Sequence, residues 1–67
     1  MKDINKLLEE NSLSYFQFDE ENSRLVYTHE VGTSQHRDDF HRLIELLKEN
    51  GIKHDDIGMD LILIEKE

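Results

Sequence analysis

The stretch TSQHRDDFHRLIELLKENG, residues 33–51, decides the fold because it carries the clearest helical pattern in the chain. Its apolar residues recur at about 100° per residue and form one stripe. These residues are Phe40, Leu43, Ile44 and Leu47, with Leu46 on the flank. Thr33 or Ser34 can cap the first turn, and Asn50-Gly51 is a usual stop signal. The sequence therefore predicts a long helix with one face packed on a core.

Two runs before this helix alternate in the manner of β-strands. Residues 14–18 place Phe16 and Phe18 on one face, and residues 24–31 alternate in the same way. The polar segment DEENS, residues 19–23, separates the two runs. Two such runs with a short polar turn between them predict a β-hairpin.

One further element is predicted at each end of the chain. Apolar residues spaced i, i+3 and i+4 predict a short helix over residues 3–10, with Asp3 as its cap. Residues 52–58 are expected to be a connection, and residues 59–66 a third strand. The predicted order of elements is therefore α-β-β-α-β.

This order predicts a small two-layer α+β domain in which residues 1–67 form a single domain. We expect a three-stranded, mainly antiparallel sheet with two helices and strand order 2-1-3. The run LILI, residues 61–64, is apolar on both faces, so each face of the sheet needs a cover. Either the two helices cover opposite faces, or a second subunit covers one. A chain this short without cysteines lacks other means of stabilisation, which favours a homodimer.

Charge is the strongest compositional feature. Sixteen acidic residues oppose eight basic ones, giving a net charge of −8. Direct binding to nucleic acid or to anionic membranes is therefore disfavoured, and a basic protein surface is the favoured partner. The start of the chain lacks the apolar stretch of a signal peptide, and no apolar run could span a bilayer. We expect a soluble, cytoplasmic protein.

The motif HRDDFH, residues 36–41, contains the residue types of metal and catalytic sites. His36 and His41 lie about 140° apart on a helix, so they cannot share one metal ion. Asp38, His41 and Glu45 share the polar side of the helix and could bind a divalent ion, although a solvated charged face is the simpler interpretation. The chain has no cysteine nucleophile and no glycine-rich phosphate loop. We therefore predict no catalytic residues, no metal and no cofactor, and do not expect an enzyme.

These observations favour a small acidic protein–protein interaction domain. In its sharper form, acidic pairs mimic nucleic-acid phosphates and inhibit a basic nucleic-acid-binding protein. In size and charge the chain resembles the small acidic inhibitors that phages and mobile elements encode, although no motif identifies such a family. The predicted partner-binding residues are Glu20, Glu21, Asp38, Asp39, Glu45, Glu49, Asp55 and Asp56.

The alternative is a dimeric structural or adaptor protein that binds through an apolar face of its sheet. That face would carry either Leu61 and Leu63 or Ile62 and Ile64, because neighbouring strand residues point to opposite sides. In this interpretation the charge serves only solubility.

Overall fold

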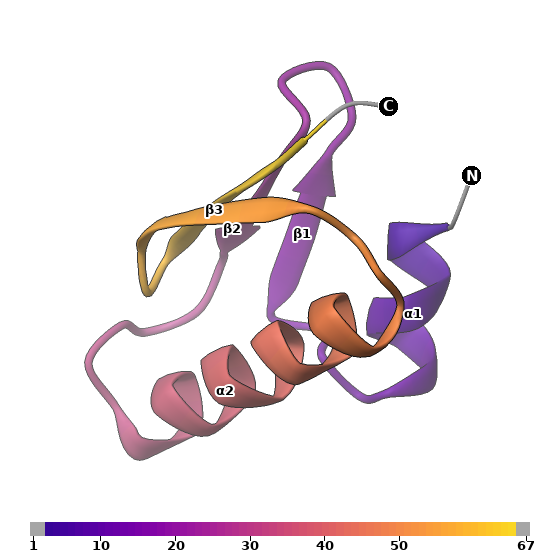
Figure 1. The fold of residues 1–67 in the computed structure, drawn as a ribbon. Helices are drawn as coiled ribbons and strands as arrows, with labels where there is room; N and C mark the ends of the chain where they lie inside the picture. Colours follow the sequence, from indigo (N-terminus) through magenta and orange to yellow (C-terminus); the bar gives the residue numbers. More distant parts are fainter. Residues whose placement is uncertain (1–2, 66–67) are drawn as a thin grey trace.

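The computed structural model describes residues 3–65 and shows one antiparallel sheet with two helices (Figure 1). The elements, in chain order, are α1 (Ile4–Glu10), β1 (Phe16–Asp19), β2 (Arg24–Tyr27), α2 (Ser34–Glu49), β3 (His54–Gly58) and β4 (Leu61–Ile64). The described part of the sheet has four strands in the order β1-β2-β4-β3. The small α+β architecture is thus confirmed, whereas the strand number and order differ from the prediction.

Both predicted helices form, and both begin at the predicted caps. The Asp3 side chain accepts a hydrogen bond from the Lys6 backbone N–H at 3.2 Å. The Thr33 hydroxyl accepts one from the His36 N–H at 3.1 Å. These bonds satisfy backbone donors that have no partner within the first turn of a helix. After α2 the chain reverses at Gly51, whose φ of +65° suits a residue without a side chain.

The expectation that residues 52–58 form a connection is wrong, because they contain β3. Within the described part of the chain this strand pairs only with β4, and its three central residues are exposed. The predicted order 2-1-3 is wrong for the same reason. The crossover through α2 leads into β3, and β4 then turns back to pair directly with β2 in the antiparallel sense. β2 and β3 still run parallel, but β4 lies between them.

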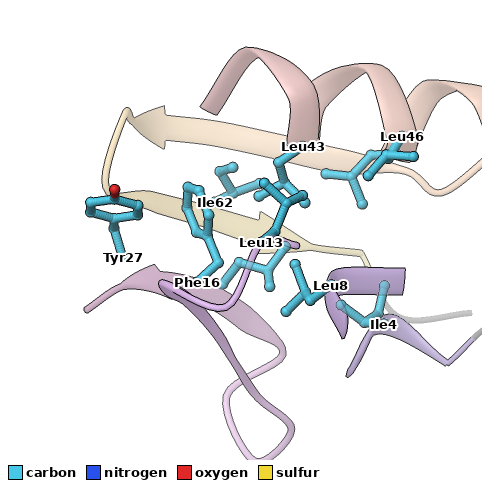
Figure 2. Packing of buried hydrophobic residues seen from close by; sticks show 10 residues of the cluster. Ile4, Leu8, Leu13, Phe16, Tyr27, Leu43, Leu46 and Ile62 are labelled. Carbon is cyan, nitrogen blue, oxygen red and sulfur yellow. The ribbon is translucent and has the colours of Figure 1, made fainter. Parts of the chain in front are cut away.

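The core lies on one face of the sheet, where both helices pack. The cross-strand pairs Phe16↔Tyr27 and Leu25↔Ile62 turn these four side chains to that face. Figure 2 shows side chains from both helices meeting them. The buried apolar cluster comprises Ile4, Leu8, Leu13, Phe16, Leu25, Tyr27, Leu43, Leu46, Leu47 and Ile62. A single core means that the first alternative, helices on opposite faces, is wrong.

The other face of the sheet is not covered by either helix. Val26, Leu61 and Leu63 belong to this face because they alternate with the buried residues of β2 and β4. All three are half-buried. We call the face formed by these three residues and their cross-strand neighbours the open face.

Candidate functional site

The open face has an apolar centre with polar margins. Val26 lies opposite Leu61, and Arg24 lies opposite Leu63, across the β2–β4 pair. On the β3 side, Asp55 lies opposite Leu63. An apolar centre surrounded by polar residues is the composition of many protein interfaces. The LILI run is therefore divided: Ile62 supports the core, and its neighbours Leu61 and Leu63 line the open face.

The margin of the open face beside β1 is fixed by Asp19. Its carboxylate accepts hydrogen bonds from the Asn22 side chain at 2.9 Å and from the Arg24 guanidinium at 3.3 Å. The Asn22 hydrogen bond, together with Arg24, holds the pKa of the Asp19 carboxyl below its usual range. Asp19 therefore stays ionised, and the neighbouring Glu20 and Glu21 extend this negative charge along the exposed turn.

Further apolar side chains are exposed around the turn between β3 and β4 and in the loop that precedes α2. The register between β3 and β4 shifts between Asp56 and Gly58, so Ile57 is the extra residue of a β-bulge. Ile57 is 61% exposed, and Met59 in the following turn is 41% exposed. Val31, in the loop between β2 and α2, is 53% exposed.

The loop and the turn that carry these residues are joined through His36. The His36 ring is only 3% exposed. Its Nδ1 accepts a hydrogen bond from the Gly32 N–H at 3.0 Å, so the ring proton lies on Nε2, which donates to the Met59 carbonyl at 2.8 Å. The contacts of His36 with the loop and the turn were not predicted.

A second buried contact holds the first turns of α2 against β2. The Tyr27 hydroxyl donates to Asp39 Oδ2 at 3.1 Å, and the Gln35 side chain donates to Asp39 Oδ1 at 2.8 Å. The Tyr27 ring also packs on the His36 ring, with centroids 4.3 Å apart. We call Tyr27, Gln35, His36 and Asp39 the polar clasp. These contacts join the first turns of α2 to β2 and to the turn between β3 and β4.

The placement of Asp39 corrects one predicted binding residue. Asp39 is 7% exposed, and both of its carboxylate oxygens accept hydrogen bonds within the clasp. It is therefore a structural residue and cannot form part of an exposed acidic surface. Its neighbour Asp38 is exposed, because one residue rotates a helix position by about 100°.

The remaining predicted residues fall into two separate regions. Asp38, Glu45 and Glu49 lie exposed on α2, whereas the other four predicted residues lie on the sheet and its first turn. Figure 1 shows the turn between β1 and β2 on the side of the molecule away from α2. The second group comprises Glu20, Glu21, Asp55 and Asp56. The eight residues thus do not gather on one surface.

The two regions differ in charge balance. In α2, four carboxylates are accompanied by three basic residues, and one of these, Arg42, contacts Glu45 at 3.4 Å. In residues 19–27 and 53–65, which hold the sheet strands β2, β3 and β4 with their turns, seven carboxylates are accompanied by two basic residues. The negative charge is therefore concentrated on the sheet strands and their turns. By register, Asp19 and Asp55 lie on the open face, whereas Asp56, opposite Ile62, lies on the helix side.

The described residues offer no metal centre. Residues 3–65 contain no group of three or more histidine, aspartate or glutamate side chains that could hold a metal ion. The possible set of Asp38, His41 and Glu45 is therefore not assembled. The exposed face of α2 is a charged surface that includes the Arg42–Glu45 ion pair.

The clasp predicts a loss of stability at alkaline pH. Burial raises the pKa of the Tyr27 phenol, and its hydrogen bond to Asp39 adds to this effect. Because an unfolded tyrosine ionises near pH 10 while folded Tyr27 stays protonated, the free energy of unfolding will fall as the pH rises beyond about 10. Urea denaturation between pH 8 and 11 measures this fall. A Tyr27→Phe variant will show a smaller fall in the free energy of unfolding than the native chain. A Tyr15→Phe variant, which keeps Tyr27, will not show this reduction. Equal falls in the two variants would contradict the assignment of the effect to Tyr27.

Comparisons with known proteins add no family to this description. No helix within residues 3–65 combines the length and apolar character needed to cross a membrane. No family model matches the chain, and neither a curated protein nor a solved structure matches it.

Proposed function

We propose that the chain is a protein-binding domain that uses its open face to bind a partner with a basic surface. The observation that carries this proposal is that Val26, Leu61 and Leu63 remain only half-buried on the more acidic side of the molecule. The apolar centre supplies the area that is removed from water on binding. The surrounding carboxylates attract a basic partner and orient it during encounter.

A basic partner fits this surface better than a second copy of the chain. Two copies that met through their open faces would bring together surfaces with the same excess of carboxylates, which opposes association. A dimeric structural or adaptor protein is the alternative function, and the half-buried Leu61 and Leu63 are the observation in its favour. Sedimentation at micromolar concentration separates the two, because the leading proposal expects a monomer and the alternative a dimer.

In its finer form, the proposal is that the domain inhibits a nucleic-acid-binding protein in the cytoplasm. Glu20 and Glu21 in the first turn, and Asp55 and Asp56 on β3, are pairs of exposed carboxylates. Such pairs compete for the lysine and arginine residues that otherwise contact phosphates. Duplex DNA should then displace the domain from its partner, and the complex should weaken as salt increases.

The test is affinity capture from a lysate of the source cells with matched variants. Leu61→Asp combined with Leu63→Asp places two charges in the open face, and Glu45→Lys combined with Glu49→Lys changes the exposed face of α2. We expect the native chain and the α2 variant to retain the same basic protein, and the open-face variant to lose at least 90% of it. Circular dichroism of both variants checks that they are folded.

Two results would contradict this function. The first is equal capture by the folded open-face variant and by the native chain. The second is a loss of capture in the α2 variant alone, which would assign binding to the outer face of that helix. A captured partner that duplex DNA cannot displace would remove the inhibitory form and leave the binding domain.

A further inference from the structure

Among residues 3–65, the first strand of the sheet, β1, has a free edge. β1 pairs with β2 on one side and ends the strand order. The Thr28 N–H donates to the Tyr15 carbonyl at 2.6 Å, so in this antiparallel pair the odd-numbered residues of β1 bond to β2. The backbone N–H and C=O of Phe18 therefore point away from β2, toward α1.

A groove of about 420 Å³ runs between this edge and α1. Figure 1 shows α1 beside β1. Side chains from both faces of β1 line the groove, which places it along the edge of the strand. The lining residues are Asn5, Leu8, Glu9, Ser14, Phe16, Gln17 and Phe18. The volume lies within the range of about 300–1,000 Å³ that is usual for ligand sites.

The opposite edge of the sheet, formed by β3, carries features that oppose the addition of another strand. Asp55 and Asp56 place two charges on that strand, and the bulge at Ile57 interrupts its regular spacing. Charged residues and bulges are the usual means by which proteins protect an edge strand. The segment Phe16-Gln17-Phe18 of β1 has neither feature. β1 is therefore the edge that can accept a further strand.

We propose that the groove binds an extended, basic segment of a partner protein, which adds a strand to the free edge of β1. The Phe18 N–H and C=O supply main-chain hydrogen bonds, and the half-buried Phe18 side chain supplies apolar contact. Among residues 3–65, Glu9 is the charged residue of the lining, and its carboxylate favours a lysine or arginine in the segment. This site lies at the edge of the sheet and stands independently of the open face.

The proposal is tested by NMR titration of the full chain with a blocked six-residue peptide of alternating lysine and valine. We expect chemical-shift changes at residues 16–19 and at least tenfold slower hydrogen exchange of the Phe18 amide. The matched control is the same peptide with alternate backbone amides N-methylated, in both registers. It keeps every side chain and charge but cannot pair with a strand, so it should bind at least tenfold more weakly.

Variants of α1 test the position of the groove. Asn5→Trp places a large side chain in it and should weaken peptide binding at least tenfold, whereas Lys6→Trp, on an exposed residue outside the lining, should leave binding within about threefold. Glu9→Lys should weaken binding more than Glu10→Lys, which makes the same charge change outside the lining.

Three results would overturn the strand-addition site. They are no binding at millimolar peptide, equal binding of the N-methylated peptides, and shift changes confined to Val26, Leu61 and Leu63. The last result would place the basic peptide on the open face, which would support the proposed function while removing the groove. If the open-face variant captures the partner as well as the native chain does, the proposed function is contradicted, and the groove test is unaffected.

Discussion

Ile62→Ala will lower the free energy of unfolding by about 2–5 kcal/mol, and Leu63→Ala, one residue along, by less than about 1 kcal/mol. Ile62 has 0% exposure and lies opposite Leu25 at the centre of the sheet. Truncation there removes apolar contacts and leaves a cavity among residues from both helices. Leu63 is half-buried on the open face, so its truncation removes fewer apolar contacts, and water can fill the space that the side chain leaves.

Urea denaturation of both variants measures this difference. The stability of a domain of 67 residues is about 3–10 kcal/mol, so the Ile62→Ala substitution will remove a substantial share of it. Comparable losses in the two variants would contradict the division of LILI into a core face and an open face. A greater loss for Leu63→Ala would mean that the helices cover the other side of the sheet.

The second large effect concerns the acidic pair in α2. Asp39→Ala will cost about 1–3 kcal/mol, because it leaves the buried Tyr27 hydroxyl and the Gln35 amide without their acceptor. Asp38→Ala removes an exposed carboxylate and will change stability by no more than about 0.5 kcal/mol. Two adjacent aspartates should thus differ severalfold in their effect on stability.

A double-mutant cycle isolates the contact within the clasp. If the Tyr27–Asp39 hydrogen bond stabilises the fold, Asp39→Ala will cost less in a Tyr27→Phe background than in the native chain. Thermal denaturation of the four proteins gives the coupling. Strictly additive losses would show that the two side chains do not interact, and the Tyr27–Asp39 contact would then not belong to the clasp.

The helices could be predicted from the sequence because their signals are local. Asp3 and Thr33 are side chains that cap the first turn, and Gly51 permits the reversal that ends α2. The stripe from Phe40 to Leu47 repeats at the helical period. Each signal lies within a few residues of the structure that it specifies, so no knowledge of distant contacts is needed.

The strand β3 could not be predicted by the same means. Its sequence, HDDIG, contains a single large apolar residue, and a bulge at that residue disturbs the alternation. An edge strand that pairs on one side and faces water needs little apolar character. Without β3, the sequence prediction places β4 directly after the α2 crossover and therefore parallel to β2. The wrong strand order follows from that error.

The candidate site shows the same limit. The acidic residues are visible in the sequence, but which carboxylate is buried depends on contact between β2 and α2. Asp39 accepts from Tyr27, which is 12 residues earlier, and His36 donates to Met59, which is 23 residues later. Neither partner can be identified from local spacing. The structure therefore removes Asp39 from the exposed acidic residues, and the predicted residues on α2 lie among basic neighbours.

The fold and the proposed function are connected through the placement of both helices on one face. This arrangement completes a core and leaves Val26, Leu61 and Leu63 half-buried on the other face of the sheet. The clasp then holds together the loop and the turn that border this surface. By register, Asp19 and Asp55 share the open face with this apolar centre, and the sheet strands with their turns carry a larger excess of carboxylates than α2 does.

The most direct test of this account is methyl NMR of the labelled chain with the captured partner. We predict that the methyl signals of Val26, Leu61 and Leu63 shift or broaden on binding, while the backbone amides of Asp38, Glu45 and Glu49 on α2 remain unchanged. Changes at those α2 residues with unaltered methyl signals at the open face would contradict the account.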